Sequence, residues 1–277
     1  MSNISSNTVF HFTNWGNLLS ILKEGFYPRY SLENLPVSTD GNVKLAIPMV
    51  SFCDIPLSQI KEHVKTYGSY GIGMTKKWAN KAGLNPVLYL RGKSELNNKI
   101  QTVFVDGRKF NMALVERYQT ELESMSKNPS EGLLSKEYLT KMTKEIISNM
   151  FSLFTLISYT KKYKGFSEKR KKKICFYDER EWRYVPDHKK LSDIKCMFLS
   201  KEEFQDKHTL SEANSRIENT KLNIVMKDIN YIIVKNDSEI LTMIKELENI
   251  KKNKHTGKMI KKLTSRIITY QQIKNDL

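Results

Sequence analysis

The order of strand-like and helix-like segments is the sequence feature that most constrains the fold. Strand-like segments at 8–13, 47–56, 70–78 and 86–91 precede a long helix-like stretch, and others at 175–186, 196–200 and 229–236 follow it. Strands therefore do not alternate strictly with helices, as they would in a doubly wound parallel fold. We predict an α+β fold with a mixed, largely antiparallel sheet.

The helix-like stretch covers residues 94–160, where glycine is rare and the helical period is sustained. Asn128-Pro129 and Gly132 divide it into at least two helices. We interpret 94–160 as a helical insertion within a single α+β domain spanning 1–277. Residues 251–277 form a basic C-terminal extension, in which 265–273 is predicted as a last strand or helix.

Shorter elements are predicted between the strands. Leu18, Ile21 and Leu22 give an apolar face to a helix that follows the first strand, and Thr13 or Asn14 can cap it. Two prolines and an Asp-Gly pair predict a surface loop over 26–42. Apolar spacing predicts a further helix over 57–68.

Composition excludes several classes of protein. The longest apolar patch, 150–159, is too short for the roughly 20 residues of a membrane helix, and the first residues do not resemble a signal peptide. We therefore expect a cytoplasmic protein that does not enter a membrane. The three cysteines, Cys53, Cys175 and Cys196, are far apart, and no histidine motif is present, so no metal site is predicted.

A net charge of +16 predicts attraction to polyanions. Segment 161–173 holds eight basic residues and one acidic residue. It is interpreted as a solvated loop, with a polyanion contact or a flap over a cleft as alternatives. Segment 251–263 is also basic, and either segment could contact nucleic acid or a partner protein.

The stretch CFYDEREWRYVP, residues 175–186, carries charges within a strand-like pattern. In an extended strand Glu179, Glu181 and Arg183 share one face, and the carboxylates stand roughly 6.5–7 Å apart. Like charges at that distance raise each other's pKa unless a cation intervenes, and Arg183 could be that cation. A surface ion-pair ladder and a catalytic carboxylate are both compatible with this pattern.

His11 lies mid-strand between Phe10 and Phe12, so its side chain points away from both. If the phenylalanines face the core, His11 faces solvent or a cleft. A structural histidine bonded to the backbone is the alternative interpretation.

Several motifs together resemble a known family. The segments FCDIPLS, YGSYGIGM and EREWRYVP, with VFHFTNWGNLLSILKEG before them and INYIIVKN after them, are similar to AbiGi-type abortive phage-resistance proteins. The resemblance covers most of the chain except the helical insertion and the basic tail. It implies a bacterial anti-phage protein, and family members are described as antitoxin or partner components.

A looser resemblance is to ADP-ribosyltransferases of the diphtheria-toxin and DarT-like kind, through His11, Tyr70 and Glu181. It implies a split sheet with NAD, as substrate and without metal, in the cleft. His11 would bind the adenosine ribose, Tyr70 or Tyr67 would stack on nicotinamide, and Glu181 would be catalytic.

Further residues follow from the same resemblance. Glu179 would orient the acceptor, a nucleic acid or a protein, and Ser51 and Thr13 would complete the NAD-binding set. In one branch an arginine occupies the place of His11, so the pattern here is mixed. The alternative function is a non-enzymatic antitoxin or regulatory partner of a toxin in a phage-defence system.

Overall fold

The computed structural model describes residues 6–37, 43–127, 134–187, 189, 191, 197–251 and 257–276. Its centre is an eight-stranded sheet with the strand order β12-β11-β4-β1-β3-β10-β5, and β2 pairs with β3 beside this path. Only β11 and β12 pair in parallel within it. The prediction of a mixed, largely antiparallel α+β fold is therefore confirmed.

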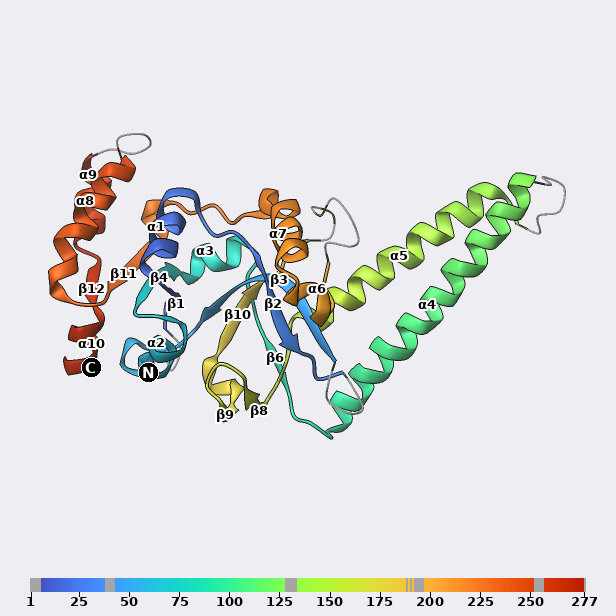
Figure 1. Ribbon diagram of the computed structural model, residues 1–277, viewed down its shortest axis with the longest axis horizontal. Helices are drawn as coiled ribbons and strands as arrows, with labels where there is room; N and C mark the ends of the chain where they lie inside the picture. The colour runs from blue at the N-terminus through green and yellow to red at the C-terminus, as the bar shows by residue number, and fades with distance from the viewer. Residues whose placement is uncertain are drawn as a thin grey trace.

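The N-terminal part supplies the middle of the sheet (Figure 1). Strand β1 (Thr8–Thr13) is followed by α1 (Trp15–Glu24), which Asn14 caps by accepting a hydrogen bond from the backbone N–H of Asn17. Strand β2 (Arg29–Asn34) then pairs along its whole length with β3 (Lys44–Cys53). The prediction of a loop over 26–42 is therefore wrong for residues 29–34, while 38–42 lie outside the described residues.

The next elements complete this half of the sheet. A 3₁₀ turn, η1 (Leu57–Gln59), leads into α2 (Lys61–Tyr67), as the apolar spacing predicts. Strand β4 (Tyr70–Thr75) is shorter than predicted because Thr75 caps α3 (Lys76–Lys81). Two short strands follow, β5 (Asn85–Pro86) and β6 (Leu88–Leu90).

A helical hairpin projects from the body (Figure 1). It consists of α4 (Glu95–Lys127) and α5 (Lys136–Ser158), the latter capped by Ser135. The 33 residues of α4 correspond to about 50 Å at 1.5 Å per residue. The predicted helical stretch thus forms two helices, with the predicted breakers lying between them.

The basic segment that follows the hairpin is not a loop. It forms β7 (Thr160–Lys162), which pairs with β6, and a small antiparallel hairpin of β8 (Lys164–Ser167) and β9 (Lys172–Cys175). The interpretation of 161–173 as a solvated loop is therefore wrong for most of its length.

The stretch 175–186 is not one extended strand. It contains a 3₁₀ turn, η2 (Phe176–Glu179), before β10 (Glu181–Tyr184). Arg180 between them has a φ of 44°, in the left-handed region that reverses the local direction of the chain. The predicted alternation of side chains therefore holds from Glu181 onward only.

The C-terminal part covers the sheet with helices and adds two strands. The predicted strand 196–200 is wrong as a strand: Leu199 makes an isolated bridge to Ala46, and Cys196 lies outside the described residues. Strand β11 (Ile229–Val234) is confirmed. The remaining elements are α6 (Lys201–Gln205), α7 (Lys207–Arg216), η5 (Glu218–Thr220), η6 (Met226–Asp228), η7 (Asp237–Glu239), α8 (Ile240–Lys251), α9 (Gly257–Thr264), β12 (Ile267–Thr269) and α10 (Tyr270–Asp276).

The alternation of β1 divides the core between the two faces of the sheet. Val9 faces a large cluster with α1, α3, α8 and α9, whereas Phe10 and Phe12 face a smaller cluster with Ile60 and Val64. Successive strand residues point to opposite faces, so His11 lies on the side of Val9. The predicted orientation of His11, away from both phenylalanines, is confirmed by its ring contacts with Phe26 and Phe52.

Candidate functional site: a charged cavity at a gap in the sheet

A gap between β1 and β3 creates the cavity. Among the described residues these two strands are in register at one position, Phe10 opposite Cys53, whereas β1 and β4 pair along their full length. A cavity of ≈ 450 Å³ lies here and is lined by residues of both strands, of β2 and of the segment 161–181. That volume is in the range of small-molecule sites.

Glu181 is the most strongly held carboxylate of the cavity. Its Oε1 accepts hydrogen bonds from Ser51 Oγ at 2.8 Å and Arg183 Nε at 2.6 Å, and its Oε2 accepts one from Lys161 Nζ at 2.7 Å. Burial alone would raise the pKa of Glu181, but the charges and hydrogen bonds of Arg183 and Lys161 outweigh burial and hold the pKa well below its usual range. Glu181 is therefore ionised and fully paired.

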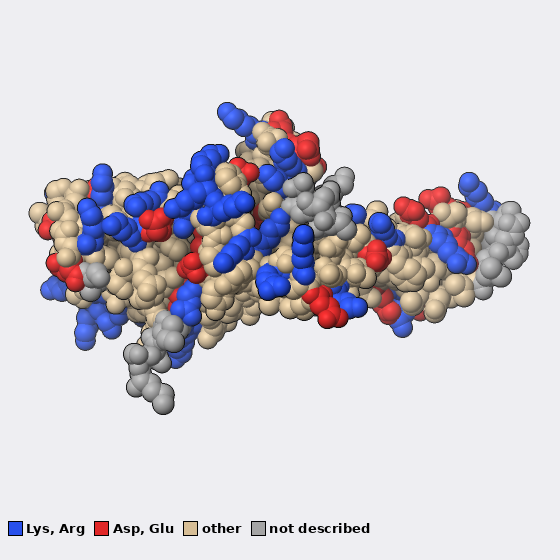
Figure 2. Space-filling view, turned by 90° about the horizontal axis from the view of Figure 1, so that it is seen from below, with Lys and Arg blue, Asp and Glu red and all other residues tan. Residues whose placement is uncertain are grey.

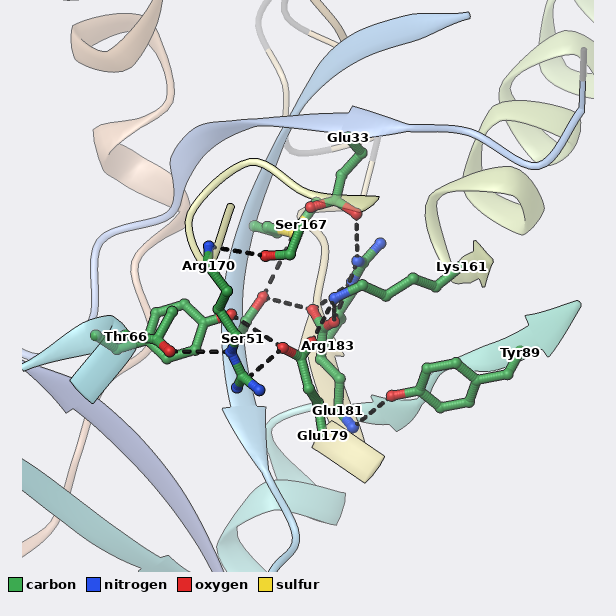
Figure 3. A network of polar contacts seen from close by, with 12 residues as sticks. Glu33, Ser51, Thr66, Tyr89, Lys161, Ser167, Arg170, Glu179, Glu181 and Arg183 are labelled. Atoms are coloured by element: carbon green, nitrogen blue, oxygen red, sulfur yellow. Dashed lines mark hydrogen bonds and ion pairs between the residues drawn. The ribbon is translucent and has the colours of Figure 1, made fainter. Parts of the chain in front are cut away.

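Glu179 reaches the same place from the η2 turn. Its Oε2 accepts a hydrogen bond from Lys161 Nζ at 2.8 Å, and its Oε1 lies 3.5 Å from both Arg170 Nη2 and the Tyr67 hydroxyl. Lys161 therefore bridges the two glutamates, as Figure 3 shows. Burial alone would lower the pKa of Lys161, but the surrounding carboxylates hold the pKa above its usual value.

Arg183 closes the network on the far side. Its side chain is fully buried, and it donates to Glu33 Oε2 at 2.7 Å and to the Ser158 carbonyl at 2.8 Å as well as to Glu181. The cluster thus balances the carboxylates of Glu33, Glu179 and Glu181 with the cations of Lys161, Arg170 and Arg183 (Figure 3). A closed network of this kind leaves neither Glu179 nor Glu181 with an unpaired carboxylate.

Sequence reasoning identified Arg183 as the cation beside Glu181, but it missed Lys161 and Glu33. Lys161 lies within a run of similar basic residues, and Glu33 lies in the segment predicted as a loop. Nothing local distinguishes either residue, because their partners come from distant parts of the chain.

His11 lines the cavity beside the charged network. Its Nδ1 donates to the Ser51 carbonyl at 2.8 Å, and its ring lies against Phe26 and Phe52. Burial lowers the pKa of His11, so the imidazole is neutral near pH 7 and its Nε2 is an acceptor.

The structure brings most of the other predicted site residues into this cavity. Thr13, Ser51 and Tyr67 line it together with His11, Glu179 and Glu181. Thr13 Oγ1 accepts a hydrogen bond from Asn17 Nδ2 at 3.1 Å, and the Tyr67 ring lies 4.6 Å from Lys169 Nζ.

Tyr70 is not among the residues that line the cavity. Its hydroxyl donates to Glu239 at 2.9 Å, and its ring packs edge-on against Trp15. The structure therefore does not bring Tyr70 together with His11 and Glu181, and Tyr67 is the tyrosine of the predicted set that lies in the cavity.

His63 is a cavity residue to which the sequence reasoning assigned no role. It is buried, and its Nδ1 has no hydrogen-bond partner among the described residues. Burial lowers the pKa of His63 to about 4, so the ring is neutral near pH 7. An unpaired buried nitrogen of this kind is a candidate contact for a polar ligand.

Two searches returned nothing within the described parts of the chain. No group of three or more His, Cys, Asp or Glu side chains there could hold a metal ion. No helix there is both long enough and apolar enough to cross a bilayer.

The fold and the site define a mixed α+β protein with a charge-balanced cavity at a gap in its sheet. No solved structure matches the chain. Residues 24–235 match the family model described as "Putative abortive phage resistance protein AbiGi, antitoxin". The chain is also 30% identical over 281 residues to an abortive phage resistance protein AbiGi from Lactococcus lactis subsp. cremoris, covering 91% of this chain and 99% of that protein. The chain belongs to the AbiGi family.

Proposed function

We propose that this chain is an antitoxin-type component of a phage-defence system and that it acts by binding a partner toxin through the α4–α5 hairpin. The description of the family supports the antitoxin role. The observation that carries the proposal is a stripe of exposed apolar side chains on the hairpin.

The stripe lies on α4. Leu96, Val103 and Phe110 are 56%, 57% and 65% exposed, and they follow one another at intervals of seven residues. Seven residues come close to two full helical turns, so the three side chains share one side of the helix. Apolar residues at this spacing are typical of a helix that packs against another helix.

The charge of the hairpin supports a protein partner. Residues 95–158 contain eight basic and eight acidic residues, so the whole net charge of +16 lies outside them. A neutral, partly apolar element suits a protein interface better than a polyanion, because interface centres are depleted in charged residues.

Photocrosslinking tests this proposal in the native host. A photoreactive amino acid at position 110 should give an adduct with a protein that inhibits growth on its own and is neutralised by co-expression of this chain. The same amino acid at the exposed position Glu116 of α4 is the matched control. A growth-inhibiting partner that crosslinks equally at both positions, or whose neutralisation survives Phe110→Asp, would contradict the proposal.

A second candidate function is an NAD-binding cleft of the ADP-ribosyltransferase kind. The observation that favours it is the meeting of His11, Ser51 and Glu181 at one cavity. The pairing of Glu181 with Lys161 and Arg183 weighs against catalysis, because a carboxylate shared between two cations has little charge left to stabilise a cationic transition state.

Labelled NAD distinguishes the two functions. Transfer or hydrolysis by the purified chain that is lost in His11→Ala and Glu181→Gln, with unchanged thermal unfolding, would support the second candidate. Absence of NAD binding by calorimetry would exclude it and leave the antitoxin proposal unaffected.

A further inference from the structure

The small hairpin β8–β9 presents an aromatic side chain between lysines on one face. In its register Phe166 lies opposite Lys173, and Lys164 precedes Phe166 by two residues. Paired residues and residues two apart share a face of a strand ladder, so all three side chains project together. Phe166 is 55% exposed, and both lysines are also exposed.

More aromatic surface adjoins this face. The Lys164 ammonium lies 5.5 Å from the centre of the Tyr163 ring, which in turn lies 5.7 Å from the ring of Tyr177. Tyr177 is 49% exposed and packs edge-on against Tyr89. Exposed rings and cations therefore alternate across β8–β9 and the adjacent η2 turn.

The surrounding charge is basic and weakly compensated. Lys171 and Lys172 are 77% and 62% exposed, and their acidic neighbours, Glu168 at 3.8 Å and Glu62 at 4.0 Å, are themselves exposed. Exposed pairs of this kind contribute little and are readily displaced by another anion. Figure 2 shows Lys and Arg gathered over the middle of the body, whereas both signs mix along the projecting hairpin.

We propose that β8–β9 and the adjoining Tyr163 and Tyr177 form a binding surface for single-stranded nucleic acid. Unpaired bases stack on exposed aromatic rings in a sequence-tolerant way, while lysines beside the rings neutralise phosphates. A duplex hides the faces of its bases, so it cannot use the rings. This surface is separate from the apolar stripe of α4 and does not depend on the toxin-binding proposal.

Fluorescence anisotropy with labelled single-stranded RNA, single-stranded DNA and a duplex of equal length tests the proposal. We expect the single strands to bind more tightly than the duplex. Phe166→Ala should weaken single-strand binding roughly tenfold, within the range found when a stacking aromatic is removed. Lys164→Gln with Lys173→Gln should reduce the slope of log affinity against log salt by about one.

Matched controls lie on the α4–α5 hairpin. Phe110→Ala removes an equally exposed phenylalanine, and Lys141→Gln with Lys144→Gln removes two exposed lysines, so neither change should alter binding. All substituted side chains are exposed, and unchanged thermal unfolding would verify the fold. Equal binding of duplex and single strand, full binding by Phe166→Ala, or binding to anionic lipid vesicles but not to oligonucleotides would each overturn the proposal.

Discussion

Lys161 Nζ lies 2.7 Å from Glu181 Oε2 and 2.8 Å from Glu179 Oε2, so one buried ammonium joins the two glutamates that flank Arg180. Lys161 comes from the strand that follows the helical hairpin, and Glu181 begins the strand β10 of the main sheet. This bridge fixes the segment 161–181 to the sheet and closes one side of the cavity.

Replacing Lys161 by Met should destabilise the fold by about 3–5 kcal/mol, since it leaves buried carboxylates without their shared cation. Urea denaturation would measure the loss. Lys164→Met, at an exposed position, should change stability by no more than about 0.5 kcal/mol. Adding Glu179→Gln to Lys161→Met should recover part of the loss, and a further large loss would contradict the bridging role.

Arg183→Lys should also destabilise the protein, by roughly 2–3 kcal/mol, although it preserves the charge. A lysine cannot reproduce the planar set of donors that serves Glu181, Glu33 and the Ser158 carbonyl together. Chemical denaturation would show the change. Arg91→Lys, at an exposed position, is the control and should be neutral; equal stability of the two variants would argue against the network.

Stability should fall as the pH is lowered from about 6.5 to about 4. Burial lowers the pKa of His63 to about 4 and also lowers that of His11, so the unfolded chain binds more protons than the native state in this window. The contribution of His63 is about 2–3 kcal/mol. Denaturation at several pH values should show a shallower pH dependence for His63→Gln.

The matched control for this titration is His208→Gln. The His208 side chain is 82% exposed, so its replacement should leave the pH dependence as it is in the natural chain. If His63→Gln and His208→Gln gave the same profile as the unaltered chain, His63 would not be the group responsible.

Gly68→Ala should cost roughly 2–4 kcal/mol. Gly68 has a φ of 120°, and an added Cβ would lie 2.1 Å from the carbonyl oxygen of Thr13, a residue that lines the cavity. Thermal or urea denaturation would measure the effect. Gly92→Ala meets nothing within 4 Å and should be neutral or slightly stabilising, so a similar loss in both variants would refute this explanation.

Local patterns predicted the elements whose signals lie in adjacent residues. Alternation predicted β1 and the side on which His11 lies, the helical period predicted α4 and α5, and an apolar run predicted β11. The predicted site was recovered in large part, because six of its seven residues, all but Tyr70, line the cavity.

The missed features depend on partners distant in the chain. Strand β2 has the composition of a loop and becomes a strand because β3 offers it a pairing edge. The turn at Arg180, which separates Glu179 from the strand, interrupts a pattern that reads as continuous in the sequence.

The sequence by itself determined the α+β class, the helical insertion, the family and the residues at the gap in the sheet. Tertiary structure alone decided that Lys161 is buried while its basic neighbours are exposed, and that Tyr70 pairs with Glu239 outside the cavity. The physical reason is that the burial of a charge depends on which opposite charges the fold brings to it, and these come from segments that no local pattern connects.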